Sequence, residues 1–169
     1  AYKGRILIDV SKEVSDDLQT KLLLYRLRAK VNIIETSISV STGIDNPPIG
    51  AFKDPRHGAL GWRSYENSPI NQGIDWKKLR VAYGIPETNI ELIRDKTYIL
   101  EAGFEKLNGV DFKKGCYVGQ EITARMKHKT TLRKGLIKVS VIGETPVGTE
   151  ILADGRPAGV LYSQSGGYG

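Results

Sequence analysis

The spacing of apolar residues in the first part of the chain predicts a strand followed by one amphipathic helix. Residues 4–9 are predicted to form a short strand, with Ile6 and Ile8 on one face and Leu7 on the other. Ser15 then provides an N-cap for a helix that runs to about Ala29, with two acidic residues in its first turn. Three residues recur at helical spacing and are expected to form the buried face of this helix, namely Leu18, Leu22 and Tyr25.

Strand-forming residues then lead to a second helix. The β-branched content of residues 31–36 and 38–41 favours strands, and residues 59–65 predict another. Asp75 is expected to cap a helix over residues 76–83 that ends at the glycine that follows.

The pattern becomes β-rich after residue 130. A last helix is predicted over residues 117–127. Strands are predicted over residues 136–142, 150–153 and 160–163, and the Asp154-Gly155 pair is a strong hairpin signal. The fold class is therefore α+β, with an α+β region over residues 1–130 and the start of a small β-barrel domain over residues 131–169.

Composition narrows the possible functions. The chain has 169 residues, and no apolar run approaches the roughly 18 residues of a membrane span. Cys116 is the one cysteine, so no internal disulfide can form, and with only two histidines the chain cannot complete a zinc site by itself. We therefore expect no metal site of its own.

The net charge of +6 is compatible with an anionic partner or with an ordinary basic surface, because Lys and Arg are spread along the chain. Direct nucleic-acid binding is not expected, because the chain lacks an aromatic-rich sheet signature of RNA recognition.

The residues around Cys116 carry the clearest chemical signal. The thiol follows Gly115, which frees the backbone, and precedes the first turn of the predicted helix, where unpaired N–H groups favour an anion. Lys113 and Lys114 add positive charge, so a reactive thiolate is one reading. The other is that Cys116 is a small buried hydrophobe, as free cysteines usually are.

Three polar residues follow on the predicted helix. Gln120 and Glu121 offer an amide and a carboxylate, and Arg125 lies four residues after Glu121 on the same helical face. An ordinary surface salt bridge between Glu121 and Arg125 explains that spacing equally well.

The string from Lys114 to Arg125 resembles the signature of the YgfZ family, K-G-C-(F/Y)-x-G-Q-E-x-x-x-R, at every fixed position. Weaker similar segments occur in the family's order at residues 24–31, 60–63, 80–87 and 107–110. The resemblance therefore covers most of the chain, and its central motif is highly specific.

The resemblance implies a multidomain fold similar to the T-protein of glycine cleavage, an aminomethyltransferase, with tetrahydrofolate in a central hole. It implies a factor that supports assembly or repair of iron–sulfur proteins, including tRNA-modifying enzymes, with assembly proteins or client enzymes as partners. Such a factor would lie in the cytoplasm of a bacterium or in the mitochondrial matrix of a eukaryote. If it is an enzyme, a folate-dependent one-carbon transferase is expected.

The resemblance also assigns roles to individual residues. Cys116 and Lys114 would form the reactive or tuning pair of the folate cavity. Glu101 would accept two N–H bonds from the pteridine edge, although a plain surface glutamate is equally compatible. The residues assigned to the cofactor site are Glu101, Lys114, Tyr117, Gln120, Glu121 and Arg125, of which the last three more often hold the motif's shape than touch the ligand.

The chain departs from the family at several places. The family's leading segment is missing, the span between Asp9 and Ser15 is short, and Gly103 stands where the family usually has Asn. We therefore expect a fold that is incomplete at both ends, with a folate site open on one side.

Two other functions remain possible at this point. A true aminomethyltransferase would act on a lipoyl-bound aminomethyl group, although T-proteins do not carry the K-G-C-Y-x-G-Q-E string at this place. A basic RNA-binding module would show salt-dependent tRNA binding.

Overall fold

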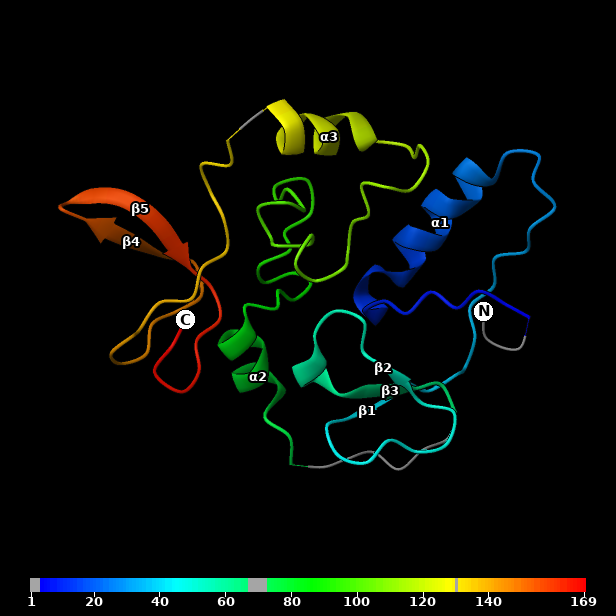
Figure 1. The fold of residues 1–169 in the computed structure, drawn as a ribbon, viewed down its shortest axis with the longest axis horizontal. Helices are drawn as coiled ribbons and strands as arrows, with labels where there is room; N and C mark the ends of the chain where they lie inside the picture. The colour runs from blue at the N-terminus through cyan, green and yellow to red at the C-terminus, as the bar shows by residue number, and fades with distance from the viewer. Residues whose placement is uncertain (1–3, 67–72, 130) are drawn as a thin grey trace. The chain divides into compact units, whose positions relative to one another are not determined.

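The computed structural model describes residues 4–66, 73–129 and 131–169 of the chain (Figure 1). The backbone divides into two compact units, Ala1–Ile38 and Ser39–Gly169. Helices and small antiparallel sheets both occur, in agreement with the predicted α+β class. The T-protein-like arrangement of domains and the predicted domain boundary at residue 130 stay predictions. Between the strand predicted at 59–65 and Gly73 the sequence favours a polar loop, which lies mostly outside the described residues.

The first unit contains a 3-10 turn, η1 (Lys12–Val14), and one helix, α1 (Ser15–Arg26). The strand predicted for residues 4–9 is absent, and so is the strand predicted for residues 31–36. Ser15 is the first helical residue rather than the N-cap, because its Oγ donates to the Lys12 carbonyl at 2.9 Å. The helix ends at Arg26, before Ala29, because Leu27 adopts a positive φ of 49°.

Helix α1 buries none of its side chains. Leu18 and Leu22 are half-buried and Tyr25 is 66% exposed, so the predicted buried face is wrong for Tyr25 and only partly formed by the two leucines. The physical reason is that residues 4–38 of the first unit form no sheet against which the helix could pack. Polar bonds instead tie the helix to the segment after it, such as the one from Gln19 Nε2 to the Ile33 carbonyl at 3.3 Å.

The second unit begins with a three-stranded antiparallel sheet in the order β1-β3-β2. The strands are β1 (Ser41–Gly43), β2 (Phe52–Lys53) and β3 (Trp62–Ser64), and a 3-10 turn, η2 (Gly58–Leu60), precedes β3. The strand predicted for residues 38–41 is thus present only from its last residue onward. The strand predicted for residues 59–65 is shortened by η2.

Two glycines allow β1 and β3 to approach closely. The Trp62 indole crosses Gly43, where an added Cβ would lie 2.4 Å from the ring. Its Nε1–H donates to the Asp45 carbonyl at 3.1 Å. Gly61 has a φ of +64°, and a Cβ there would lie 2.1 Å from the Gly43 carbonyl oxygen. A larger residue at Gly43 would require the Trp62 side chain to move, and one at Gly61 would require the backbone to move.

Helix α2 (Trp76–Tyr83) confirms the sequence prediction at both ends. The Asp75 side chain accepts the Lys78 N–H at 2.8 Å, and Gly84 terminates the helix in the left-handed conformation. The Trp76 side chain packs against a buried cluster formed by Leu60, Ile85 and Leu107.

Residues 99–108 form a run of hydrogen-bonded turns rather than a regular helix. The bonds include those from Ala102 N–H to the Tyr98 carbonyl at 3.0 Å and from Gly109 N–H to the Phe104 carbonyl at 2.7 Å. The turns bury Leu100, Ala102 and Leu107, so this segment belongs to the core.

The last helix, α3 (Gln120–Lys129), begins three residues later than predicted. The reason is local, because Gly119 takes a positive φ of 87° and breaks the helical path before Gln120. Strands β4 (Thr149–Ala153) and β5 (Arg156–Leu161) then form the predicted hairpin, and Asp154 and Gly155 at its tip both have positive φ.

The strand predicted for residues 136–142 is present only as an isolated pairing with the end of the chain. Ser140 and Tyr168 form an antiparallel bridge, and Val139 and Gly169 exchange two backbone bonds of 2.9 and 3.0 Å.

A buried carboxylate joins this C-terminal region to the loop after α2. Glu91 is only 8% exposed, and its two oxygens accept the N–H groups of Glu87 at 2.9 Å and of Ser163 at 3.1 Å. Arg80 pairs with Glu87 and lies 3.9 Å from Glu91. We call the Glu91 carboxylate and its two backbone donors the Glu91 clamp. It connects Glu91 with Ser163, which are far apart in the sequence.

Replacement of Gly61 by alanine tests the close approach of β1 and β3. We expect Gly61→Ala to lower the free energy of unfolding by about 1–3 kcal/mol or more, because the new Cβ is strained at positive φ and strikes the Gly43 carbonyl. Urea denaturation gives the value. Gly58→Ala is the matched control, since a Cβ at Gly58 meets no atom within 4 Å and its φ is not positive. Equal stability of the two variants would contradict the packing described.

Candidate functional site

A pocket of about 250 Å³ lies beside the signature motif, within the second unit. The turn segment before the motif and the motif itself supply its walls. Two of the predicted site residues, Lys114 and Tyr117, line it. The remaining lining residues are Ile99, Asn108, Gly109, Val110 and Asp111.

Tyr117 organises the motif locally. The Lys114 ammonium lies 4.8 Å from the centre of the Tyr117 ring, which is a cation–π contact. The Tyr117 N–H donates to Gln120 Oε1 at 3.0 Å, and the Gln120 N–H donates back to the Tyr117 carbonyl at 3.2 Å. Gln120 therefore holds the loop at the start of α3, which is the shape-keeping role expected of it.

Cys116 lies between two pocket-lining residues in the chain, but the thiol is exposed and is not itself among the lining residues. It also stands four residues before α3 begins at Gln120, so the predicted stabilisation of a thiolate by the first helical turn is not present in this geometry. The thiol is not a buried hydrophobe either. What remains is an accessible sulfur flanked by Lys114 and the half-buried Tyr117.

The other predicted residues are not gathered at the pocket. Glu101 is half-buried, and its backbone carbonyl accepts the Leu136 N–H at 2.9 Å, but it does not line the pocket. Glu121 and Arg125 are exposed on α3, and within the described part of the chain no ion pair joins them. Their assigned role at a cofactor stays a prediction.

Asp111 and Asn108 are pocket residues that the sequence reasoning did not single out. The Asp111 Oδ1 accepts the Lys113 N–H at 2.7 Å, which fixes the charged loop. Asn108 Nδ2 donates to the Pro55 carbonyl at 2.8 Å, although the two residues are 53 positions apart. Asn108 falls in one of the weaker family-like segments, which was the available signal, whereas no motif marked Asp111 as a site residue.

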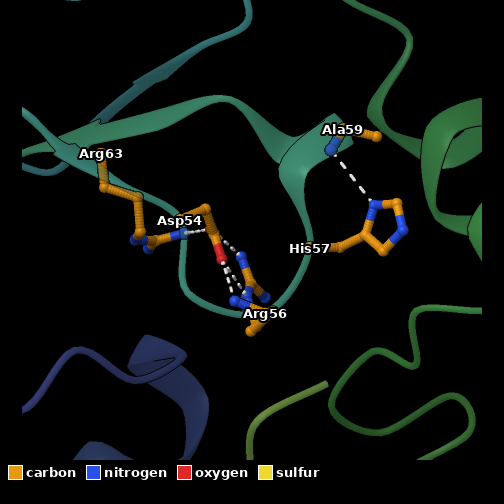
Figure 2. Close-up of polar contacts among 5 residues, drawn as sticks. All are labelled: Asp54, Arg56, His57, Ala59 and Arg63. Atoms are coloured by element: carbon orange, nitrogen blue, oxygen red, sulfur yellow. Dashed lines mark hydrogen bonds and ion pairs between the residues drawn. The ribbon is translucent and has the colours of Figure 1, made fainter. Parts of the chain in front are cut away.

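The loop that receives Asn108 is held by a buried aspartate. Asp54 is 5% exposed, and its carboxylate accepts three hydrogen bonds from Arg56. The donors are the Arg56 backbone N–H at 3.0 Å, Nε at 2.9 Å and Nη2 at 2.7 Å. Arg63 on β3 adds an ion pair at 3.4 Å (Figure 2). In the same loop, His57 Nδ1 accepts the Ala59 N–H at 3.1 Å and starts η2.

These contacts keep Asp54 ionised. Burial by itself raises the pKa of Asp54, but the hydrogen bonds from Arg56 and the positive charges of Arg56 and Arg63 outweigh it and lower the pKa below its ordinary value. No sequence motif pointed to this cluster, because its three members are brought together by the turn between β2 and β3.

Two negative findings concern the described residues only. In residues 4–66, 73–129 and 131–169, no group of three or more His, Cys, Asp or Glu side chains is arranged to hold a metal ion. Over the same ranges, none of the helices has the length and apolar character needed to cross a bilayer.

Asp54→Asn tests the buried ion cluster. Asparagine keeps the shape of the Asp54 side chain but removes the negative charge with which Arg56 and Arg63 both interact. At pH 7 we therefore expect the free energy of unfolding to fall by about 1.5–3 kcal/mol. The folded-state pKa is lowered, so the contribution of Asp54 is complete above its unfolded pKa of about 3.9 and is lost as the pH falls through the folded value.

Denaturant unfolding of both proteins should therefore differ less near pH 3 than at pH 7. Asp95→Asn is the control, because Asp95 is 89% exposed in its ion pair with Arg94 and should matter by at most about 0.5 kcal/mol. A difference between wild type and Asp54→Asn that does not shrink on acidification would refute the electrostatic account.

Comparison with known proteins adds an independent line of observation. Residues 133–169 match the family model of the CAF17 C-terminal beta-barrel domain. The chain is 30% identical to the mitochondrial iron–sulfur cluster assembly factor IBA57 of Homo sapiens, over 96% of the chain and 54% of the relative. It is 38% identical to the IBA57 homolog of Neurospora crassa, over 90% of the chain and 42% of the relative.

The chain thus spans about half the length of the curated relatives it matches. The alignment with the human protein covers 194 positions, more than the 169 residues of the chain, so the relative has residues in this span that the chain lacks. The matches support kinship with iron–sulfur cluster assembly factors of the T-protein-like superfamily, and none is specific to its YgfZ branch.

Proposed function

We propose that this chain is part of a tetrahydrofolate-binding protein that supports the assembly or repair of iron–sulfur proteins, tRNA-modifying enzymes among them. The observation that carries the folate part is the pocket that Lys114 and Tyr117 of the signature motif form with Asp111. The observation that carries the iron–sulfur part is the similarity to IBA57 proteins over nearly the whole chain.

The chemistry of the pocket fits one end of a folate. Asp111 offers a carboxylate to the N–H groups of a 2-amino-pyrimidinone edge, the role that the resemblance gave to Glu101. Tyr117 offers an aromatic wall, and Lys114 a cation for a carboxylate of the ligand's tail. Asn108 uses its amide nitrogen on Pro55 and so has its amide oxygen to offer as an acceptor.

The size of the pocket agrees with partial enclosure. At about 250 Å³ it is slightly smaller than the roughly 300–1,000 Å³ of typical ligand pockets, and it suits a bicyclic ring better than a whole folate. The rest of the ligand would lie outside it, as expected for a site that is open on one side.

Cys116 would act where the ligand and a partner protein meet. The sulfur is exposed, and its neighbours in the chain line the pocket. A thiolate at this place can lend one ligand to a cluster that a partner protein holds, or it can react with the bound one-carbon unit. The IBA57 relatives are mitochondrial by name, which favours the mitochondrial matrix over the bacterial cytoplasm for this chain as well.

Substitution of Lys114 tests the folate site. We expect Lys114→Ala to weaken tetrahydrofolate binding about tenfold, because the pocket loses its one lysine and the cation over Tyr117. Isothermal titration under reducing, anaerobic conditions measures the affinity. Lys113→Ala is the matched control, since Lys113 has the same charge one residue away and does not line the pocket. Equal losses in both variants would mean that only general charge matters, and unchanged binding in both would remove the pocket from the proposal.

Cys116→Ala tests the role of the thiol. In cells that depend on this protein, we expect the variant to lower the activity of 4Fe–4S enzymes several-fold while tetrahydrofolate affinity stays within about twofold, because the sulfur lies outside the pocket lining. Enzyme assays in cell extracts and titration of the purified variant give the two numbers. Full enzyme activity in the variant cells would remove the reactive-thiol part and leave the folate part standing.

A further inference from the structure

The net positive charge of the chain resides in one segment. Residues 122–143 contain six Lys and Arg side chains and no Asp or Glu. When these six are subtracted from the 25 basic residues of the chain, 19 remain, which equals the number of acidic residues. The rest of the chain is therefore neutral, and the segment accounts for the whole charge of +6.

Two of the six cations are engaged within the fold. Lys127 forms an ion pair with Glu105 at 2.5 Å and lies 5.3 Å from the Phe112 ring centre. Lys138 donates to the Ala82 carbonyl at 3.1 Å. These two side chains help to attach the segment to the second unit.

The other four cations are exposed, and none forms a hydrogen bond or ion pair with another described residue. The nearest carboxylates in the sequence are those of Glu121 and Glu144, which flank the segment, and within the described part of the chain neither forms an ion pair with these cations. We call these four residues the basic surface: Arg125, Lys129, Arg133 and Lys134.

Two residues of the basic surface, Arg125 and Lys129, lie on the exposed face of helix α3. Arg125 and Lys129 lie three and seven residues after Ile122, so the three share one face, and Ile122 is 58% exposed. Thr123, on the opposite side with Lys127, is buried. The helix is therefore fixed by one face and presents cations and an aliphatic side chain on the other.

The segment after α3 continues the same mixture of cations and aliphatic groups. Leu132 is 43% exposed and Ile137 is 74% exposed, on either side of Arg133 and Lys134 in the sequence. The backbone here forms no regular element, but the Leu136 N–H donates to the Glu101 carbonyl at 2.9 Å. The exposed side chains thus sit on an anchored backbone, which lowers the entropy cost of binding.

We propose that the basic surface, together with Ile122, Leu132 and Ile137, docks an acidic face of a partner protein. Carboxylates of the partner would compensate cations that have no partner among the described residues, and the exposed aliphatic side chains of the same segment would bury apolar area. A nucleic acid fits less well, because the exposed apolar side chains assigned to this surface, Ile122, Leu132 and Ile137, are aliphatic and offer no ring on which bases could stack. The surface goes beyond the folate site and does not depend on it.

The experiment uses the full chain and a labelled synthetic helical peptide that carries Glu and Leu on one face. Fluorescence anisotropy at about 0.05 and 0.5 M salt should show affinity that falls with salt, as screening requires. Reversal of the four charges, in Arg125→Glu/Lys129→Glu/Arg133→Glu/Lys134→Glu, should weaken binding at least tenfold at the lower salt concentration. The matched control reverses four exposed cations elsewhere in the second unit, in Lys53→Glu/Lys96→Glu/Lys106→Glu/Arg156→Glu, and should change the affinity less than threefold.

A second variant separates a protein partner from any polyanion. Ile122→Ser/Ile137→Ser keeps every charge, and it should weaken binding of the Glu/Leu peptide several-fold without affecting oligoglutamate. Circular dichroism checks that each variant is folded. The proposal is overturned if the peptide does not bind, if both charge reversals weaken binding equally, or if the serine variant binds as tightly as wild type. Tighter binding of tRNA than of the peptide, lost on reversal of the basic surface, would overturn it in favour of RNA. Tetrahydrofolate affinity should be unchanged in Ile122→Ser/Ile137→Ser, because neither isoleucine lines the pocket or belongs to the assigned cofactor site.

Discussion

One wall of the pocket depends on a buried negative charge, that of Asp54. A carboxylate removed from water is costly unless several donors compensate it, and here Arg56 and Arg63 do so from two sides. Their bonds fix the turn between β2 and β3, and this turn presents the Pro55 carbonyl that Asn108 binds. The wall of the pocket is thus positioned by electrostatics in a loop that is remote from it in the sequence.

The signature motif gains its shape from short-range contacts instead. Tyr117 and Gln120 bond to each other and set the point where α3 begins, while the Lys114 ammonium lies over the Tyr117 ring. Cys116 is left between them on an exposed turn. The arrangement separates two tasks: the flanking residues form a pocket, and the sulfur faces solvent, where a second protein can reach it.

Local signals predicted local structure well. Asp75 and the glycine after α2, and the Asp154-Gly155 turn, each act through their own backbone neighbours, so the sequence alone locates them. The strands expected near the N-terminus failed because β-branched content does not supply a pairing partner. Lys114 and Tyr117 could be assigned to a site from the motif. Asp111 and the Asp54 cluster could not, because neither belongs to a recognised motif and the turn between β2 and β3 brings Asp54 to Arg63.

The Glu91 clamp affects where the chain could be truncated without loss of a buried contact. Its carboxylate accepts one N–H group from the loop after α2 and another from Ser163, close to the last residue of the chain. Truncation before the β-rich region would take away one of these donors and open a shielded anion to solvent beside Arg80. One hydrogen bond of a buried carboxylate therefore crosses the predicted boundary at residue 130, and a fragment that begins after this boundary would lose it.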